Sequence, residues 1–177
     1  SENLSRCYVQ VPLADKTTDW SDERFWDVFA NRLPSDVALR LTTGPSIEKT
    51  IAAVRSFVCE PMQWGNLYLV GDSAHIVPPT GAKGLNLAVS DVRYLFEALL
   101  VAFGKAKSKT ALDGYSERAL ARVWKAMRFS NQMTQLLHQV ESEDSFAGQM
   151  RRAGLRHLAS SETARRDFAE NYVGPSF

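Results

Sequence analysis

The stretch LYLVGDSAHIVPPTGAKGLNLAVSD, residues 67–91, decides the fold of this chain. Residues 67–70 form a short, continuous apolar run, which is typical of a strand buried on both faces. Residues 73–84 carry two prolines and two glycines, so we expect neither helix nor strand there. Apolar side chains then recur at helical spacing across residues 85–99, and Gly104 would cap that helix. The pattern predicts a strand, a long loop and a helix in that order.

The same stretch carries features that suit an anionic cofactor. Asp72 follows the predicted strand directly, at the end where open α/β sheets bind ligands, and its carboxylate can accept hydrogen bonds from sugar hydroxyls. Gly81 and Gly84 permit close approach of the backbone to a ligand. The helix that starts near Leu85 opens with unpaired amides at its positive end, which favours an anion by roughly 0.3–1 kcal/mol. For a Gly-Asp pair alone, a simple turn would be the better interpretation.

Composition limits the classes of partner. The chain has 177 residues, of which 45% are hydrophobic, and 21 Lys and Arg balance 20 Asp and Glu, so no net charge recruits nucleic acid or a membrane surface. It contains no long apolar run and no signal-peptide pattern, and we therefore expect a cytoplasmic protein. Cys7 and Cys59 lack the spacing of a metal site, so no metal is expected. His75, alone in a buried loop, is predicted to be structural.

The remaining elements follow from periodicity and capping signals. Alternation predicts strands, and helical spacing with a Ser cap predicts amphipathic helices. The predicted elements are a strand at 6–13, a helix at 19–33 capped by Ser21, a strand at 51–60, a long helix at 113–140 and, from 141, a helical region broken by Gly148 and Gly154 before an irregular tail at 169–177.

Five dispersed motifs together resemble a known family. They are GDSAHIVPPTGAKGLNLAVSDV, RCYVQVPL, DWSDERFW, VRSFVCEPM and AENYVG, and they span essentially the whole chain. This set resembles the flavoprotein aromatic hydroxylases, and the first motif is similar to the second FAD motif of that family. A Rossmann-type site also needs a GxGxxG fingerprint, which is missing here. The chain is therefore expected to be the C-terminal half only.

The resemblance implies a fold class and a division into domains. The expected class is α/β, or α+β for this portion: the C-terminal part of a FAD-binding Rossmann-like fold with part of a substrate-domain β-sheet and a helical C-terminal region. We expect the end of the substrate-binding sheet domain at 1–64, the returning part of the FAD-binding domain at 65–104, and a helical region that forms a dimer interface at 105–177.

The resemblance also implies roles for eleven residues. The cofactor-binding set comprises Asp72 on the ribityl chain of FAD, the amides of Leu85 and Asn86 with Gly84 at the flavin ring, and Arg55 for NADPH. The substrate-binding set is Tyr8, Pro79 and Thr80, and the catalytic set is Tyr172, Lys83 and Arg6. Without the resemblance, Lys83 would be read as a solvated lysine, Arg6 as a surface arginine, Arg55 as an ion-pair arginine, and Tyr8 and Tyr172 as core aromatics.

The implied activity is hydroxylation of 4-hydroxybenzoate to 3,4-dihydroxybenzoate, with FAD as cofactor, NADPH as co-substrate and molecular oxygen. The full-length enzyme is expected to be a homodimer. Since a site built from two halves loses most of its binding energy when one is missing, the chain alone is expected to be inactive. Two alternatives stay open at this point: a related flavin hydroxylase acting on another phenolic substrate, and a non-catalytic fragment or dimerisation module.

Overall fold

The computed structural model describes residues 4–105, 107–138 and 144–174. The chain divides into two compact units, Ser1–Ala53 and Val54–Phe177. Among the described residues, no helix is both long and apolar enough to cross a membrane.

The first unit is built around one amphipathic helix. It contains the short helix η1 (Thr17–Asp19), α1 (Asp22–Ala30) and the single turn α2 (Ser35–Ala38). The Oγ of Ser21 accepts a hydrogen bond from the amide of Arg24 at 3.1 Å, which confirms the predicted N-cap. Helix α1 ends three residues before the predicted limit of 33.

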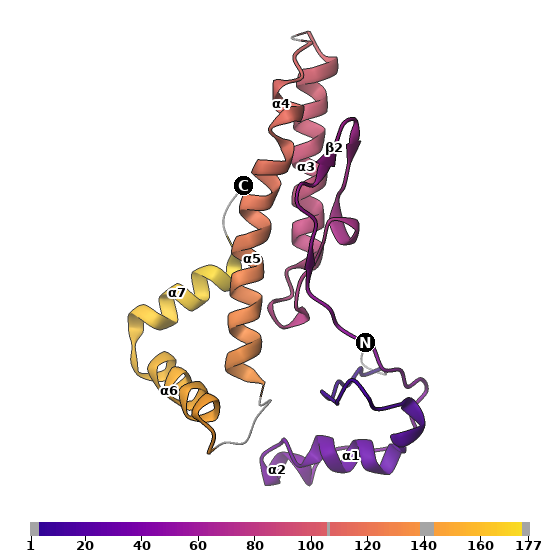
Figure 1. Cartoon of the computed structure of the whole chain (residues 1–177). Helices are drawn as coiled ribbons and strands as arrows, with labels where there is room; N and C mark the ends of the chain where they lie inside the picture. Colours follow the sequence, from indigo (N-terminus) through magenta and orange to yellow (C-terminus); the bar gives the residue numbers. More distant parts are fainter. Residues whose placement is uncertain (1–3, 106, 139–143, 175–177) are drawn as a thin grey trace. The chain divides into compact units, whose positions relative to one another are not determined.

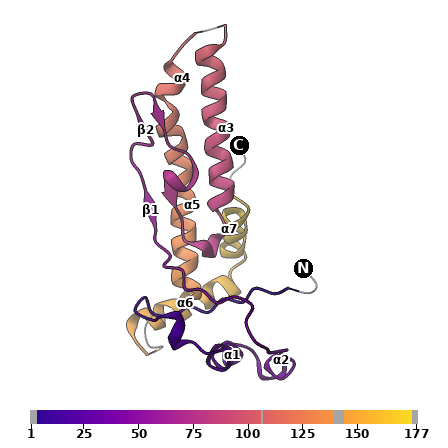
Figure 2. The same cartoon turned by 90° about the vertical axis from the view of Figure 1, so that its right-hand side faces the viewer.

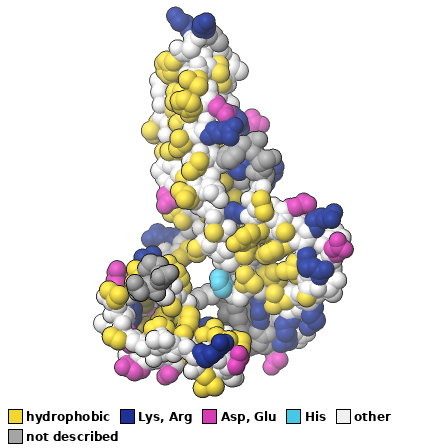
Figure 3. Space-filling view, turned by 180° about the vertical axis from the view of Figure 1, so that it is seen from behind, with side chains coloured by type: hydrophobic (Ala, Val, Ile, Leu, Met, Phe, Trp, Pro, Cys, Tyr) yellow, Lys and Arg dark blue, Asp and Glu magenta, His cyan; other side chains and the backbone are white. Residues whose placement is uncertain are grey.

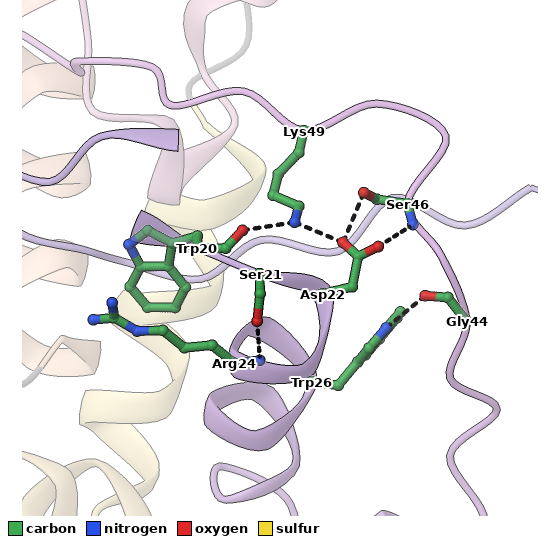
Figure 4. Close-up of polar contacts among 8 residues, drawn as sticks. All are labelled: Trp20, Ser21, Asp22, Arg24, Trp26, Gly44, Ser46 and Lys49. Carbon is green, nitrogen blue, oxygen red and sulfur yellow. Dashed lines mark hydrogen bonds and ion pairs between the residues drawn. The ribbon is translucent and has the colours of Figure 1, made fainter. Parts of the chain in front are cut away.

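A carboxylate on α1 holds the chain that returns past the helix. Asp22 accepts hydrogen bonds from the amide and hydroxyl of Ser46, at 3.0 and 2.8 Å, and its Oδ1 lies 2.6 Å from Nζ of Lys49. The indole of Trp26 donates to the carbonyl of Gly44 at 2.8 Å (Figure 4). These contacts fasten residues 44–49 to α1 without a large apolar core.

Two predicted strands are wrong or much shorter than expected. Residues 6–13 carry no strand, and within 51–60 only β1 (Phe57–Val58) is a strand. Alternation is only a local pattern, whereas a strand also needs a hydrogen-bonding neighbour. Among the described residues no segment pairs with 6–13.

The second unit holds two small antiparallel sheets. Strand β1 pairs with β4 (His75–Ile76), with Phe57 opposite Ile76, and β2 (Gln63–Trp64) pairs with β3 (Leu67–Tyr68). Gly65, with φ of 57°, makes the turn between β2 and β3. The strand pairs within the described residues are all antiparallel, and most of the regular structure is helical. The expected membership of a FAD-binding region is compatible with this arrangement, but within the described residues the sheet portion is limited to these two small sheets.

The stretch that decides the fold differs from expectation in its first half. The predicted buried strand at 67–70 is limited to β3, which pairs only with β2 among the described residues, and Leu67 is 61% exposed. The predicted loop at 73–84 contains β4 and η3 (Pro79–Gly81), and η2 (Gly71–Ser73) precedes β4. Prolines exclude long elements, but they allow two-residue strands and single 3-10 turns.

The helices are the better-predicted part. They are α3 (Gly84–Phe103), α4 (Thr110–Asp113), α5 (Tyr115–Leu137), α6 (Phe146–Ser160) and α7 (Glu162–Val173). Helix α3 confirms the prediction for 85–99, and α5 confirms most of the predicted helix at 113–140, whose last two residues lie outside the described ones. Helices α3 and α5 run side by side (Figure 1, Figure 2).

Two predictions for the C-terminal region are wrong. Gly148 and Gly154 do not break α6; a Cβ on Gly154 would lie 3.1 Å from the side chain of Leu136, so glycine lets α6 approach α5 closely. The tail predicted as irregular is helical up to Val173, because α7 packs aromatic side chains against α5. Its final residues, 175–177, lie outside the described part. Tertiary packing overrides weak helix propensity in both cases.

The core of the second unit lies between α3, α5 and the small sheets. It is formed by buried side chains, chiefly Met62, Ala74, Leu87, Tyr94, Tyr115, Ala119, Val123 and Met127. The hydroxyl of Tyr115 donates to the carbonyl of Leu69 at 2.7 Å, and Ser116 accepts from the amide of Met62 at 2.9 Å. These bonds hold the two ends of the β2–β3 hairpin against α5 and so help to position the turn that follows β3.

Candidate functional site

A buried carboxylate fixes the Gly-Asp turn. Asp91 on α3 accepts a hydrogen bond from the amide of Gly71 at 2.9 Å, and its Oδ2 also lies 2.6 Å from Nε2 of His75. Asp91 and His75 are each 1% exposed. Gly71 has φ of 61°, and a Cβ there would lie 3.3 Å from Ala88 on the helix. The hydrogen bond to Asp91 and the contact with Ala88 therefore fix the separation between the Gly71 turn and helix α3.

Sequence reasoning missed Asp91, although a signal was present. The buried face of α3 contains Leu87, Tyr94 and Ala98 at helical spacing, and Asp91 stands in the same stripe. A carboxylate in an apolar stripe must find buried partners, because desolvation without them is costly. His75 is one of those partners, as its predicted structural role requires.

The turn presents Asp72 outward. Asp72 is exposed, and the hydroxyl of neighbouring Ser73 donates to the carbonyl of Val70 at 2.8 Å, which closes the turn. Within the described part of the chain, the carboxylate of Asp72 is therefore not used to close the turn. An accessible carboxylate on a fixed backbone is the arrangement that recognition of sugar hydroxyls needs.

The N-terminus of α3 is open. Lys83 occupies the N-cap position without a side-chain cap, and the amide of Leu87 makes the first bond of the helix, to the carbonyl of Lys83 at 3.0 Å. The amides of residues 84–86 precede that bond, and Leu85 is 77% exposed. Such amides, together with the helix dipole, attract negative charge.

Gly81, in η3, and Gly84, the first residue of α3, have different surroundings. A Cβ on Gly81 would lie 2.4 Å from the buried hydroxyl of Ser130, so packing against α5 requires glycine there. At Gly84 the nearest atom to a Cβ would be 3.9 Å away, on Val77. No described neighbour therefore demands glycine at 84, and its missing side chain leaves the helix end accessible.

The structure brings together two predicted catalytic residues, Lys83 and Tyr172, that are 89 residues apart in the sequence. Lys83 is 7% exposed and its Nζ donates to the carbonyl of Tyr172. The same amino group lies 5.3 Å from the ring centroid of Tyr172 and 5.5 Å from that of Phe129. Burial, and then the charge of Arg122, lowers the pKa of Lys83. A solvated lysine is thus the wrong alternative here, whereas Tyr172 remains 51% exposed.

Two predicted substrate residues, Pro79 and Thr80, lie in the segment that links Asp72 to Lys83 in the sequence. Pro79 is exposed at the start of η3. The hydroxyl of Thr80 lies 2.9 Å from that of Thr134 on α5, and Thr134 in turn donates to the carbonyl of Ser130. Thr80 is therefore fixed against α5, and contact of either residue with a substrate stays a prediction.

Three predicted residues lie outside this stretch of the chain. Arg6 and Tyr8 belong to the first unit, and Arg55 is exposed in the segment before β1. The hydroxyl of Tyr8 lies beside the guanidinium of Arg6 and raises the pKa of Arg6. Tyr8 is 76% exposed, so a core role for it is wrong. The functions assigned to these three residues stay predictions.

Comparison with known proteins identifies the family. Residues 1–130 match the profile of a family described as FAD binding domain. The chain therefore belongs to the FAD binding domain family, and within it to the flavin-dependent aromatic monooxygenases. It is 53% identical over 174 residues to p-hydroxybenzoate hydroxylase of Acinetobacter baylyi, an alignment that covers 98% of this chain and 43% of that protein. This similarity confirms the family resemblance seen in the motifs.

More distant relatives match shorter parts. Kynurenine 3-monooxygenase of Aspergillus clavatus is 34% identical over 86 residues, which are 48% of this chain and 16% of that protein. The mitochondrial ubiquinone biosynthesis monooxygenase of Drosophila melanogaster is 41% identical over 70 residues, 38% of this chain and 14% of that protein. The chain thus spans less than half the length of these relatives.

Proposed function

We propose that this chain contributes the flavin-ring side of the active site in an FAD-dependent monooxygenase that uses NADPH and oxygen to convert 4-hydroxybenzoate to 3,4-dihydroxybenzoate. The observation that carries the proposal is the uncapped N-terminus of α3 next to a turn that Asp91 fixes and that exposes Asp72. Similarity to p-hydroxybenzoate hydroxylase along 98% of the chain supports the choice of substrate.

The cofactor would be held by backbone as much as by side chains. Asp72 would accept hydrogen bonds from the ribityl hydroxyls, and the amides of Leu85 and Asn86 would face the pyrimidine edge of the flavin, with Gly84 leaving room for it. Bound FAD supplies the transfer of electrons from NADPH to oxygen. Amides fixed at a helix end stabilise negative charge without reorganising, and this is the contribution of α3 to reduced flavin.

The remaining residues would act on the substrate and on NADPH. Pro79 and Thr80 would contact the aromatic ring, and Tyr8 the substrate carboxylate. Tyr172 would assist in removing the phenolic proton of the substrate. Lys83, which donates a hydrogen bond to the carbonyl of Tyr172, would add positive charge that favours the phenolate. Arg6 would contact the flavin and Arg55 would bind NADPH. The contact between Lys83 and Tyr172 supports the pairing of these two residues.

The same proposal includes an oligomeric state and a cellular location. We expect a homodimeric, cytoplasmic enzyme. Because the chain covers 43% of p-hydroxybenzoate hydroxylase, we expect it to be inactive by itself.

A chimeric enzyme tests the proposal. In it, this chain replaces the matching 43% of the Acinetobacter baylyi protein. We expect the chimera to bind FAD and to release 3,4-dihydroxybenzoate when supplied with NADPH, oxygen and 4-hydroxybenzoate. Failure to bind FAD would contradict the cofactor assignment, and hydroxylation of only another hydroxybenzoate would contradict the substrate.

A substitution at the helix end tests the role of α3. Asn86→Asp keeps the backbone amide but places negative charge beside reduced flavin. We expect a lower flavin reduction potential and a hydroxylation rate reduced by about tenfold or more, since electrostatic stabilisation is lost. Asn66→Asp, in the exposed β2–β3 turn, is the matched control and should change neither. Unchanged potential and rate in Asn86→Asp would remove Leu85 and Asn86 from the flavin site.

A further inference from the structure

A chain of hydroxyl groups links the predicted substrate loop to α5. The hydroxyl of Thr80, in η3, lies 2.9 Å from that of Thr134, and Thr134 donates to the carbonyl of Ser130 at 2.8 Å. Hydrophobic side chains gather along the column of helices that contains α3 and α5 (Figure 3). Polar groups packed against such a column must pair with one another, because desolvation without a partner is costly.

The loop is held against α5 at two neighbouring residues. Thr80 meets Thr134 through its hydroxyl, and a Cβ on the next residue, Gly81, would lie 2.4 Å from the buried hydroxyl of Ser130. Ser130 and Thr134 are four residues apart, about one turn of helix α5. The side chain of Thr80 therefore cannot turn away from α5 without loss of both contacts.

The number of available protons fixes the direction of these hydrogen bonds. A threonine hydroxyl has one proton to donate and two lone pairs. Thr134 gives its proton to the carbonyl of Ser130, which can only accept. The proton between the two threonines must therefore come from Thr80, and the oxygen of Thr80 is left with lone pairs alone.

The backbone before Thr80 adds to this acceptor character. Pro78 and Pro79 precede it, and proline has no N–H. The amide of Ala82 is already used, because it donates to the carbonyl of Pro79 at 2.9 Å. Two consecutive residues next to Thr80 thus supply no backbone donor to a ligand.

We propose that Thr134 is a positioning residue of the substrate site: it takes the proton of Thr80, so that Thr80 is a hydrogen-bond acceptor that selects the neutral phenol of the substrate over the phenolate. The inference rests on the proposed function, in which Thr80 contacts the aromatic substrate. A hydrogen bond donated by the neutral phenol raises the pKa of that phenol, whereas the positive charge of Lys83 lowers it. Thr80 and Lys83 therefore act on the bound phenol in opposite directions.

A pH titration of bound 4-hydroxybenzoate tests the direction of the hydrogen bonds. The phenolate absorbs at longer wavelength than the phenol, and the difference spectrum is recorded on the chimeric enzyme with FAD and without NADPH, so that no turnover is needed. Thr134→Val frees the proton of Thr80 to meet the phenolate. We expect it to lower the pKa of the bound phenol by about 0.5–1, the equivalent of one hydrogen bond.

Matched substitutions provide the controls. Thr134→Ser keeps the hydroxyl, and its bound phenol should keep the wild-type pKa. Thr134→Ala also lacks the hydroxyl and should lower the pKa as Thr134→Val does, whether or not valine fits the packing of α5. Circular dichroism checks that each variant is folded. An unchanged pKa in both folded variants that lack the hydroxyl, or an equal fall in Thr134→Ser, would overturn the inference.

Other charged or titratable groups around η3 contribute equally to every variant. They belong to the segment before α3, to α5 with its C-cap, and to α7, and none of them is substituted: Lys83, Arg122, Arg128, His138 and Tyr172. Differences between the variants in the pKa of the bound phenol therefore report the threonine hydroxyls.

Thr80→Val separates this inference from the proposed function. It removes the acceptor without supplying a donor, so the pKa of the bound phenol should fall by less than in Thr134→Val. If Thr80→Val changes neither this pKa nor the affinity for 4-hydroxybenzoate, Thr80 does not touch the substrate, which contradicts both proposals. If Thr80→Val changes them while the Thr134 variants match the wild type, the substrate contact stands and the role of Thr134 is wrong.

Discussion

Each unit of the chain uses a helical aspartate to hold a passing segment, but the two sites differ in burial. In the second unit, Asp91 holds the amide of Gly71 and the ring of His75, and the two side chains are 2% and 1% exposed. In the first, Asp22 holds Ser46 and Lys49, and the side chains of Asp22 and Lys49 are 28% and 24% exposed. Both carboxylates accept several hydrogen bonds, so their geometry alone does not separate them.

The two aspartates differ in what can bind their partners once the carboxylate is removed by substitution. Water reaches Asp22 and can satisfy Ser46 and Lys49, so an exposed pair contributes little. Around Asp91 water is excluded, and removing one partner leaves the others buried and unpaired, which is costly. The turn that exposes Asp72 therefore depends on its buried anchor far more than residues 44–49 depend on Asp22.

The largest expected effect comes from removing the buried anchor. Asp91→Ala should lower the free energy of unfolding by about 3–5 kcal/mol, because the amide of Gly71 and the ring of His75 lose a desolvated partner. Urea unfolding followed by circular dichroism measures it. Asp113→Ala, at an exposed aspartate on α4, should change stability by less than about 0.5 kcal/mol. A loss below about 1 kcal/mol for Asp91→Ala would mean that the two anchors are equivalent after all.

A second pair of substitutions compares packing in the two units. Gly81→Ala should destabilise by about 1–3 kcal/mol, because its Cβ would lie 2.4 Å from the Ser130 hydroxyl. Gly44→Ala in the first unit meets nothing within 4 Å and should be neutral or slightly stabilising. Adding Ser130→Ala should restore part of the stability lost at Gly81. If thermal unfolding shows equal effects at both glycines, the contrast in packing is wrong.

The smallest expected effect is that of the exposed anchor, and it depends on pH. The contact with Lys49, followed by hydrogen bonds from Ser46, lowers the pKa of Asp22 from 3.8 to about 2. Because the folded pKa lies below the unfolded one, its stabilisation is complete above pH 3.8 and is lost as the pH falls through about 2.

Asp22→Asn should therefore destabilise the first unit slightly near pH 7 and have no effect below about pH 2. Fluorescence of Trp20, which is 8% exposed, reports the unfolding of this unit. Asp27→Asn, at an exposed aspartate on the same helix, is the control and should change stability near pH 7 by less than about 0.5 kcal/mol. A constant difference between wild type and Asp22→Asn from pH 7 to 2 would contradict the assigned pKa.

Much of the helical structure could be predicted from the sequence. The Ser21 cap, the start of α3 near residue 84 and most of α5 follow from capping residues and apolar spacing, which are local signals. The strands were predicted less accurately than the helices. Alternation at 6–13 describes a segment that could pair, whereas pairing needs a neighbour that no described residue supplies. The glycines of α6 were misread because close packing against Leu136 is a long-range effect.

For the candidate site, the sequence by itself indicated the family, and it predicted which residues would face the cofactor. The Gly-Asp turn, Gly81, Gly84 and the ordered motifs around them were sufficient for the family, because these motifs can be recognised in the sequence alone; the roles of the individual residues stay predictions. Only the tertiary structure decided that Asp91 anchors the turn, that Lys83 is buried against Tyr172 and that the hydroxyl of Thr80 meets that of Thr134. Burial and pairing depend on segments distant in the chain meeting in space, and no local pattern records which of them meet.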